Sequence, residues 1–314
     1  MQSYLIARLL TGVITLFGIS FIVFGMINLV PGDVIAVLVG DAGYTQEEAR
    51  EIEHELGLDK PLPERYVRWL GDLFQGDLGE SIKSGREVKD IIRASVPVTL
   101  ELAIMVFVMA TLVGIPLGVW SAVRQDKVDD YIMRITAILG LSIPSFWIGT
   151  MVIVLPAIWW GWVPPLFYKD FLDDPMGNIG IMITPAAILT ANVSAVLIRM
   201  TRSSVLEVLR EDYVRTARAK GLGSTAIMSR HVLRNAVLPV LTVLGNYAAF
   251  LITGTVTLET IFNLPGLGTT VVTALNNRDF PVVTGVTLII AMGVVLVNLI
   301  VDVLYRVFDP RVSY

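Results

Sequence analysis

Six long windows of this sequence contain no charged side chain. They run over residues 9–32, 102–123, 135–168, 175–198, 235–258 and 280–301. A helix needs about 20 apolar residues, at roughly 1.5 Å of rise each, to cross the hydrocarbon core of a bilayer. Each window is long enough. The sequence therefore predicts an all-α membrane protein with about six transmembrane helices, and five and seven are the alternative counts.

The composition points the same way. Apolar residues make up 54% of the 314 residues and charged residues only 17%, against about 25% charged residues in ordinary soluble domains. This excludes a cytosolic enzyme, a disordered chain and, with a net charge of −4, a basic nucleic-acid-binding module. The chain has no cysteine and two histidines, so disulfides, thiol catalysis and a metal site are not expected.

Prolines and glycines modify this pattern. Pro144 and Pro156 should kink the third helix, whose window leaves room for one span and a re-entrant or loop tail. Residues 260–277, which follow Glu259, carry no charge but are rich in Asn and Gly. We therefore expect a loop that dips into the membrane. The first window is too long for the apolar core of a signal peptide, so we expect an uncleaved span.

Lysine and arginine in the short connections predict the orientation. Eight lie in residues 199–234 and three in residues 124–134, whereas the short connections of the other side hold only Lys169 and Arg278. Because cytoplasmic loops carry the excess of positive charge, both termini should be cytoplasmic. The connection over residues 31–95 is long enough to cross the membrane regardless of its charge, and it should be extracytoplasmic.

These assignments divide the chain into four parts. They are a first transmembrane helix (residues 1–30), a small helical extracytoplasmic insertion (31–95), a core with five transmembrane helices (96–308) that contains a cytoplasmic loop at 203–235, and a cytoplasmic tail (309–314).

The insertion should contain two short helices. Thr45 and Glu48 form a capping box for the first, which should end at Leu56. The second should run over residues 64–74. Its apolar face would hold Tyr66, Trp69, Leu70 and Leu73. The insertion is either a cap over the bundle or a docking surface for an extracytoplasmic partner, on which its acidic excess would favour a basic patch.

Residues 211–223 form the most informative stretch. Two acidic residues open it, basic residues close it and two glycines follow, which is the charge order and stop signal of a short helix. Ser224 should cap a second helix that runs to Pro239 and re-enters the membrane. Small residues at positions 217 and 219 would allow another protein to approach closely. The alternative is a basic loop that only fixes topology and contacts lipid headgroups.

Motifs along the whole chain are those of a known family. They include Val30-Pro31-Gly32-Asp33, Gly76-Asp77-Leu78-Gly79-Glu80-Ser81, Asp212-Tyr213-Val214-Arg215-Thr216-Ala217-Arg218-Ala219-Lys220-Gly221, Glu259-Thr260-Ile261-Phe262, Pro265-Gly266-Leu267-Gly268 and Asp309-Pro310-Arg311. On these motifs the sequence resembles the membrane subunit of bacterial ABC importers of the peptide/nickel permease family. It resembles in particular the B-type subunit of dipeptide and oligopeptide permeases.

The resemblance implies the type I ABC importer permease fold and a multi-pass subunit of a bacterial or archaeal plasma (inner) membrane. It implies as partners a homologous second permease subunit (C-type), one or two ATP-binding subunits that hold ATP and Mg²⁺, an extracytoplasmic substrate-binding protein and membrane lipid, with no nucleic acid. This chain would be non-catalytic and would hold no cofactor or metal, in line with its lack of a Walker A sequence. The implied cargo is a di- or oligopeptide. The family also carries glutathione, nickel chelates, opines and oligosaccharides.

In that family the 211–223 helix is the EAA loop, which docks on the ATP-binding subunit. The resemblance carries the coupling role onto Asp212, Tyr213, Arg215, Thr216, Ala217, Lys220, Gly221 and Leu222. Arg215-Thr216-Ala217 stands where the family has Glu-Ala-Ala, so the glutamate is missing here.

Polar residues in the spans are candidates for the pathway or its gate: Asn192, Asn246 and Glu259. The two asparagines could instead bond neighbouring helices, and Glu259 could instead bond the backbone of the turn that follows it. Glu101 could contact substrate, but we favour a position at the membrane interface.

Other functions would require other features. A self-contained transporter or channel would need charges near several span centres or inverted repeats. An intramembrane protease would need His-Glu-x-x-His, or Gly-x-Ser-x with a histidine in a span. A structural subunit would transport nothing. ATP-dependent uptake would separate an importer from all three.

Overall fold

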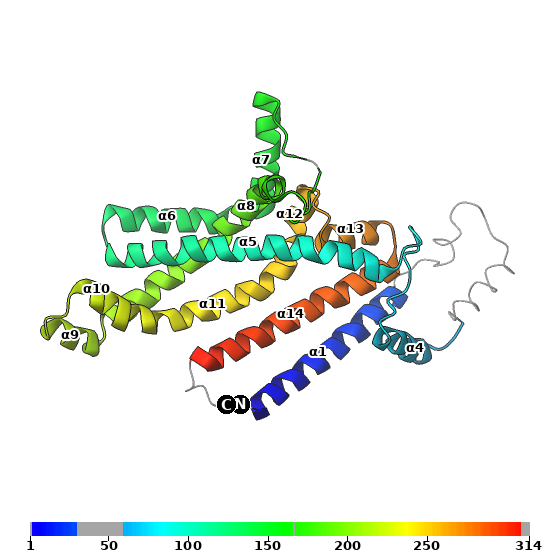
Figure 1. Ribbon diagram of the computed structural model, residues 1–314, viewed down its shortest axis with the longest axis horizontal. Coiled ribbons are helices and arrows are strands. Elements are labelled where there is room, and N and C mark those ends of the chain that lie inside the picture. The colour runs from blue at the N-terminus through cyan, green and yellow to red at the C-terminus, as the bar shows by residue number, and fades with distance from the viewer. Residues whose placement is uncertain (1, 30–58, 166, 309–314) are drawn as a thin grey trace. The chain divides into compact units, whose positions relative to one another are not determined.

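The computed structural model describes residues 2–29, 59–165 and 167–308, and most of these are helical (Figure 1). The helix predicted at 45–56 lies outside them. In this part of the chain five helices or helix series are long and apolar enough to cross a membrane. A sixth span results if α6 (Val128–Ser142) and α7 (Ser145–Trp160) count as one bent pair. The predicted count of about six is confirmed.

The spans follow the charge-free windows and extend beyond them. They are α1 (Gln2–Leu29), α5 (Val88–Val123), the α6–α7 pair, α8 (Pro175–Leu209), the series α10 (Ser224–Ile227), η2 (Met228–Val232), α11 (Leu233–Gly254) and α12 (Val256–Ile261), and finally α14 (Phe280–Phe308). The added turns carry charge, as a helix can once it leaves the hydrocarbon core. Thus α5 already begins within the predicted insertion.

Pro144 breaks the third span. It precedes the first residue of α7, with φ −62° and ψ 134°, and the axes of α6 and α7 meet at 90°. A proline has no N–H to donate and disfavours the helical region for the residue before it, so a helix ends there. Pro156 lies within α7, which continues past it to Trp160.

The expectation of a loop over residues 260–277 is wrong for twelve of them. Thr260 and Ile261 are the last residues of α12. Leu267–Asn276 forms a helix, α13. Its sequence is mostly apolar or Thr, and its first turn is bonded by a buried carboxylate, described below. The Gly and Asn residues that suggested a loop instead mark the two ends of this helix.

The chain divides into two compact units, each described by itself. The first joins Met1–Pro97 and Thr269–Met292. Within it, α4 (Leu62–Phe74) packs aromatic side chains on α1. The ring of Phe24 lies 5.4 Å from Tyr66 and 5.5 Å from Trp69, centroid to centroid. The predicted second helix of the insertion and its aromatic face are confirmed.

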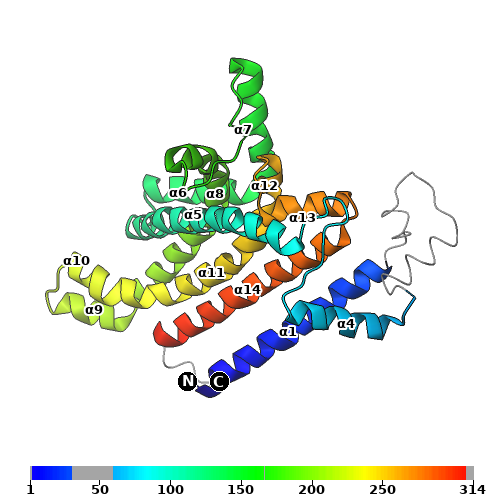
Figure 2. The ribbon, with the colours of Figure 1, turned by 45° about the vertical axis from the view of Figure 1, so that its right-hand side comes forward.

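The second unit joins Val98–Gly268 and Gly293–Tyr314. Its central helix is α8, which packs along α6 and α11 and is the most buried of the spans. Glycines allow α5 to approach it closely: a Cβ at Gly114 would lie 2.6 Å from Leu197, and one at Gly118 would lie 2.6 Å from Thr201. Small residues serve this purpose in membrane helices generally. Figures 1 and 2 show the short α9 (Asp212–Ala219) and α10 at the turn between α8 and α11.

Candidate functional site

The helix α9 is attached to the second unit by one apolar face. Val214 is fully buried and Ala217 is 6% exposed. They share an apolar cluster with residues of α5, α8, α10, η2 and α11. These neighbours are Ala122, Val205, Ile227, Val232 and Ala236. Position 217 therefore anchors the helix from inside, and the expectation that another protein approaches it closely is wrong. Ala219 is exposed, so the close approach of another protein stays a prediction for position 219.

A Schellman turn ends α9. The N–H of Gly221 donates to the carbonyl of Arg218 (2.9 Å), and the N–H of Leu222 donates to the carbonyl of Ala217 (3.3 Å). Gly221 has φ +79°, in the left-handed region that favours glycine. The predicted glycine stop is confirmed at this residue. The next helix begins differently from expectation, because Gly223, not Ser224, occupies its N-cap position and no side chain caps it.

The outer face of α9 is polar and exposed. Asp212 and Arg215 form a solvent-exposed ion pair of 3.2 Å, and Thr216 and Lys220 are also exposed. Tyr213 is 42% exposed and its hydroxyl accepts a hydrogen bond from Asn235 of α11 (3.0 Å). With Leu222, 39% exposed, these residues form what we call the α9 outer face.

A groove of about 500 Å³ lies beside this face. It is formed where α8 ends and α9 begins, and its lining mixes both signs of charge. The lining residues are Arg202, Ser203, Leu206, Glu207, Arg210, Glu211 and Asp212.

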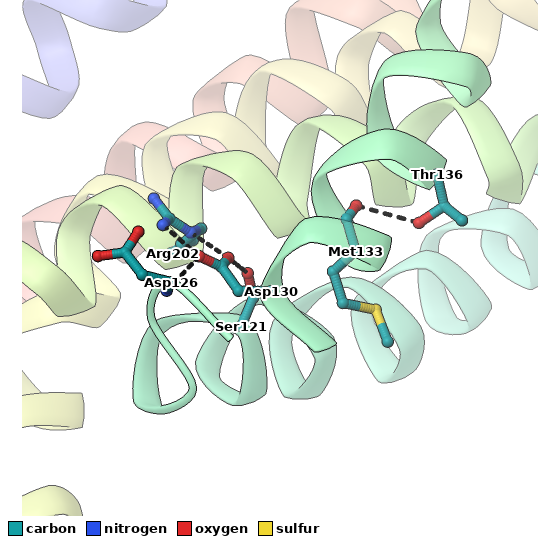
Figure 3. A network of polar contacts seen from close by, with 6 residues as sticks. All are labelled: Ser121, Asp126, Asp130, Met133, Thr136 and Arg202. Carbon is teal, nitrogen blue, oxygen red and sulfur yellow. Dashed lines mark hydrogen bonds and ion pairs between the residues drawn. The ribbon is translucent and has the colours of Figure 1, made fainter. Parts of the chain in front are cut away.

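A buried ion pair lies directly behind the groove, and no sequence pattern predicts it. The Asp130 carboxylate of α6 is fully buried and accepts two hydrogen bonds of 2.7 Å from Arg202 of α8. Ser121 of α5 donates a third, of 2.5 Å, and the N–H of Asp126 a fourth (Figure 3). One carboxylate thus ties three helices together. In the sequence Arg202 counted only as one more positive charge.

Glu259 bonds the start of α13. It is fully buried, and its carboxylate accepts hydrogen bonds from the hydroxyls of Thr99 and Thr255 (both 2.8 Å) and from the N–H of Gly268 (2.7 Å). A Cβ at Gly266 would lie 2.4 Å from this carboxylate. The Pro-Gly-Leu-Gly motif thus leaves room for a buried acid at a helix N-terminus, where negative charge is favoured. The structure places Glu259 in this turn and away from any surface of the chain.

The two asparagine candidates lie in different surroundings. Asn192 of α8 donates to the carbonyl of Gly140 in α6 (3.3 Å), so it bonds a neighbouring helix. Asn246 of α11 is exposed. Thr242 and Thr253 of α11 and Thr257 of α12 lie one or more turns away on the same face, with the half-exposed Phe250 among them. We call the four polar residues the α11 polar stripe. An exposed polar face in a helix of span length faces a cavity or a protein partner more often than lipid.

Glu101 belongs to a cluster at the other end of the second unit. Its carboxylate accepts hydrogen bonds from the Tyr168 hydroxyl and from Asn178 (both 3.1 Å). Burial and the neighbouring Glu101 raise the pKa of the Tyr168 phenol, so it stays protonated and donates. The side chain of Glu101 therefore connects α5, the α7–α8 loop and α8.

Family models cover nearly the whole chain. Residues 114–314 match the model described as "Binding-protein-dependent transport system inner membrane component", and residues 1–103 match the corresponding N-terminal model. The chain belongs to this family. It is therefore a multi-pass inner membrane permease that works with a binding protein and an ATPase, and it is not itself the catalytic subunit. The predicted family and location are confirmed.

Curated relatives match along their full length. The dipeptide transport system permease protein DppB of Escherichia coli (strain K12) is 40% identical over 100% of this chain and 99% of its own. A putative peptide transport system permease protein of Brucella suis is 40% identical over 100% of both chains. The di/tripeptide transport system permease protein DppB of Pseudomonas aeruginosa is 38% identical over 100% of this chain and 99% of its own.

Solved structures share the fold. An amino acid ABC transporter matches with a TM-score of 0.54 at 12% identity, over 69% of this chain and 94% of the other. The MetNI methionine ABC transporter in an inward-facing conformation matches with a TM-score of 0.53 at 16% identity, over 70% of this chain and 96% of the other. The expected ABC importer permease fold is confirmed.

Proposed function

We propose that this permease forms half of a translocation pathway for di- or oligopeptides, with a homologous second permease subunit as the other half. An extracytoplasmic binding protein would deliver the peptide. The ATP-binding subunits would act on the α9 outer face. The relatives named as dipeptide and di/tripeptide permeases, at about 40% identity over the full length, support peptide as the cargo.

The observation that carries the coupling role is the two-sided character of α9. Its inner face is buried in a cluster to which five other helical elements contribute, while its outer face is exposed. A force applied to the outer face therefore reaches α5, α8 and α11 through close packing, which transmits displacement because packed interiors deform little. A loop that only fixed topology would need neither the buried face nor the Schellman turn.

The α11 polar stripe is our proposal for part of the pathway surface of this subunit. Asn246 lies at its centre, about 18 Å along the helix from Arg234 at the ordinary rise per residue. Asn192 and Glu259 would support the pathway only indirectly, because the side chain of each is hydrogen-bonded within the chain.

Cysteine cross-linking tests the coupling role directly, since the chain has no cysteine of its own. Thr216→Cys places a thiol on the α9 outer face of the full importer. We expect a short bifunctional maleimide to join it to an ATP-binding subunit, with a yield that changes when ATP is added. Lys127→Cys, exposed at the α5–α6 turn, is the control. Equal yields at both positions, or none at 216, would contradict the proposal.

A further inference from the structure

The helix α4 has two rows of apolar side chains, and α1, which lies beside it in Figures 1 and 2, covers mainly one of them. In the covered row, Tyr66 and Trp69 pack on Phe24 of α1. The other row follows spacings of four, three and four residues, and we call it the α4 apolar row: Pro63, Val67, Leu70 and Phe74. Within the described part of the chain most of this row is uncovered, since Val67 is 68% exposed and Phe74 is 74% exposed.

The charged side chains of α4 face away from the apolar row. At 3.6 residues per turn they share the other side of the helix: Glu64, Arg65, Arg68 and Asp72. Two acidic and two basic residues leave this side without net charge. A helix with sharply separated apolar and charged sides, and little apolar character on average, is typical of helices that lie in the plane of a membrane interface.

The contacts with α1 fix the level of α4 relative to the bilayer. Three residues of α1 contact aromatic rings of α4: Phe17, Phe21 and Phe24. All three lie within residues 6–25, the part of α1 that is long and apolar enough to cross a membrane. The rings of Phe17 and Phe74 are 6.3 Å apart, so the α4 apolar row reaches this level too. It continues a surface of α1 that is itself exposed and apolar, as a lipid-facing surface is.

The level of these contacts and the charged side together favour one position for α4. Deeper burial would place four charged side chains in hydrocarbon, which is strongly unfavourable. A position in water would leave the α4 apolar row hydrated and would break the ring contacts with a helix that crosses the membrane. Neither cost arises if the row faces acyl chains while the charged side faces headgroups and water.

We propose that α4 is an interfacial helix whose apolar row is inserted into the outer leaflet of the bilayer. Its partner is the acyl chains of the lipid. Because the charged side has no net charge, insertion requires no anionic headgroup. The helix thereby anchors the connection between α1 and α5 to the membrane surface, and its apolar row is not a docking surface for another protein. This inference goes beyond the proposed function and does not depend on the cargo.

Spin labels on single cysteines test the position of α4, since the chain has no cysteine of its own. The complete importer, with its other subunits free of cysteine, is placed in nanodiscs of phosphatidylcholine. Power saturation then compares collisions of the label with oxygen, which concentrates in the bilayer, and with a water-soluble nickel chelate. At Val67→Cys and Phe74→Cys we expect severalfold more collisions with oxygen than with nickel.

Arg68→Cys is the matched control, because it follows Val67 directly but lies on the charged side. There we expect the opposite order, with nickel favoured. A preference for nickel at positions 67 and 74 as well would place α4 in water and overturn the proposal. Exclusion of both reagents at these positions, with or without added binding protein, would show that a protein subunit covers the row and would equally overturn it.

Discussion

At the scale of single residues, buried carboxylates hold this protein together at its helix ends. Asp130 joins three helices near the predicted cytoplasmic side, and Glu259 bonds the first turn of α13. In the first unit Asp279, 4% exposed, accepts hydrogen bonds from the Ser81 hydroxyl and from the N–H of Ile82. Each acid is buried with several donors, which is the condition under which burial of a carboxylate is tolerated.

Removing Asp130 should be strongly destabilising. Asp130→Ala leaves Arg202 partly buried without its counter-ion, and such changes cost about 3 kcal/mol or more. The measurement is thermal unfolding of the purified importer in detergent. The double variant Asp130→Ala/Arg202→Met should recover part of the loss, because neither charge is then left alone. Asp212→Ala breaks an exposed pair and should leave the midpoint unchanged; a drop as large as that of Asp130→Ala would contradict this assignment.

At the scale of elements, the α9 turn depends on a single backbone conformation. Gly221 at φ +79° allows the chain to reverse after two turns of helix and to enter α10. A Cβ at this position would meet no atom within 4 Å, so space does not restrict the residue. Only the conformation does.

Two substitutions at Gly221 should therefore differ in their effect on coupling. Val is β-branched and should cost about 1–2 kcal/mol in this conformation, whereas Asn tolerates it. We expect Gly221→Val to lower the peptide taken up per ATP hydrolysed while the chain still inserts and assembles, and Gly221→Asn to stay near wild type. Equal uptake per ATP in the two variants would show that the turn is not what couples the subunits.

At the scale of the whole molecule, a permease of this family must expose its pathway to water from one side at a time. If the α11 polar stripe lines that pathway, its accessibility should change with the state of the ATP-binding subunits. Single cysteines at Asn246 and Thr253 should react with a water-soluble maleimide at rates that differ severalfold between ATP-bound and nucleotide-free importer. Leu296→Cys, exposed on α14, is the control and should show no such change. A uniform, nucleotide-independent rate at all three positions would argue for a lipid-facing stripe.

The sequence alone determined the number of spans, the short helix before Gly221 and the family, because hydropathy, helix stop signals and motifs are local in the chain. It misjudged Ala217 and residues 267–276, and it did not foresee Asp130–Arg202. Which face of a short helix is buried depends on what packs against it. Whether a buried acid finds its partner depends on residues 72 or 160 positions away, as for Asp130 and Glu259. Only the tertiary structure brings such groups together, because helix packing and not sequence distance decides which polar atoms meet.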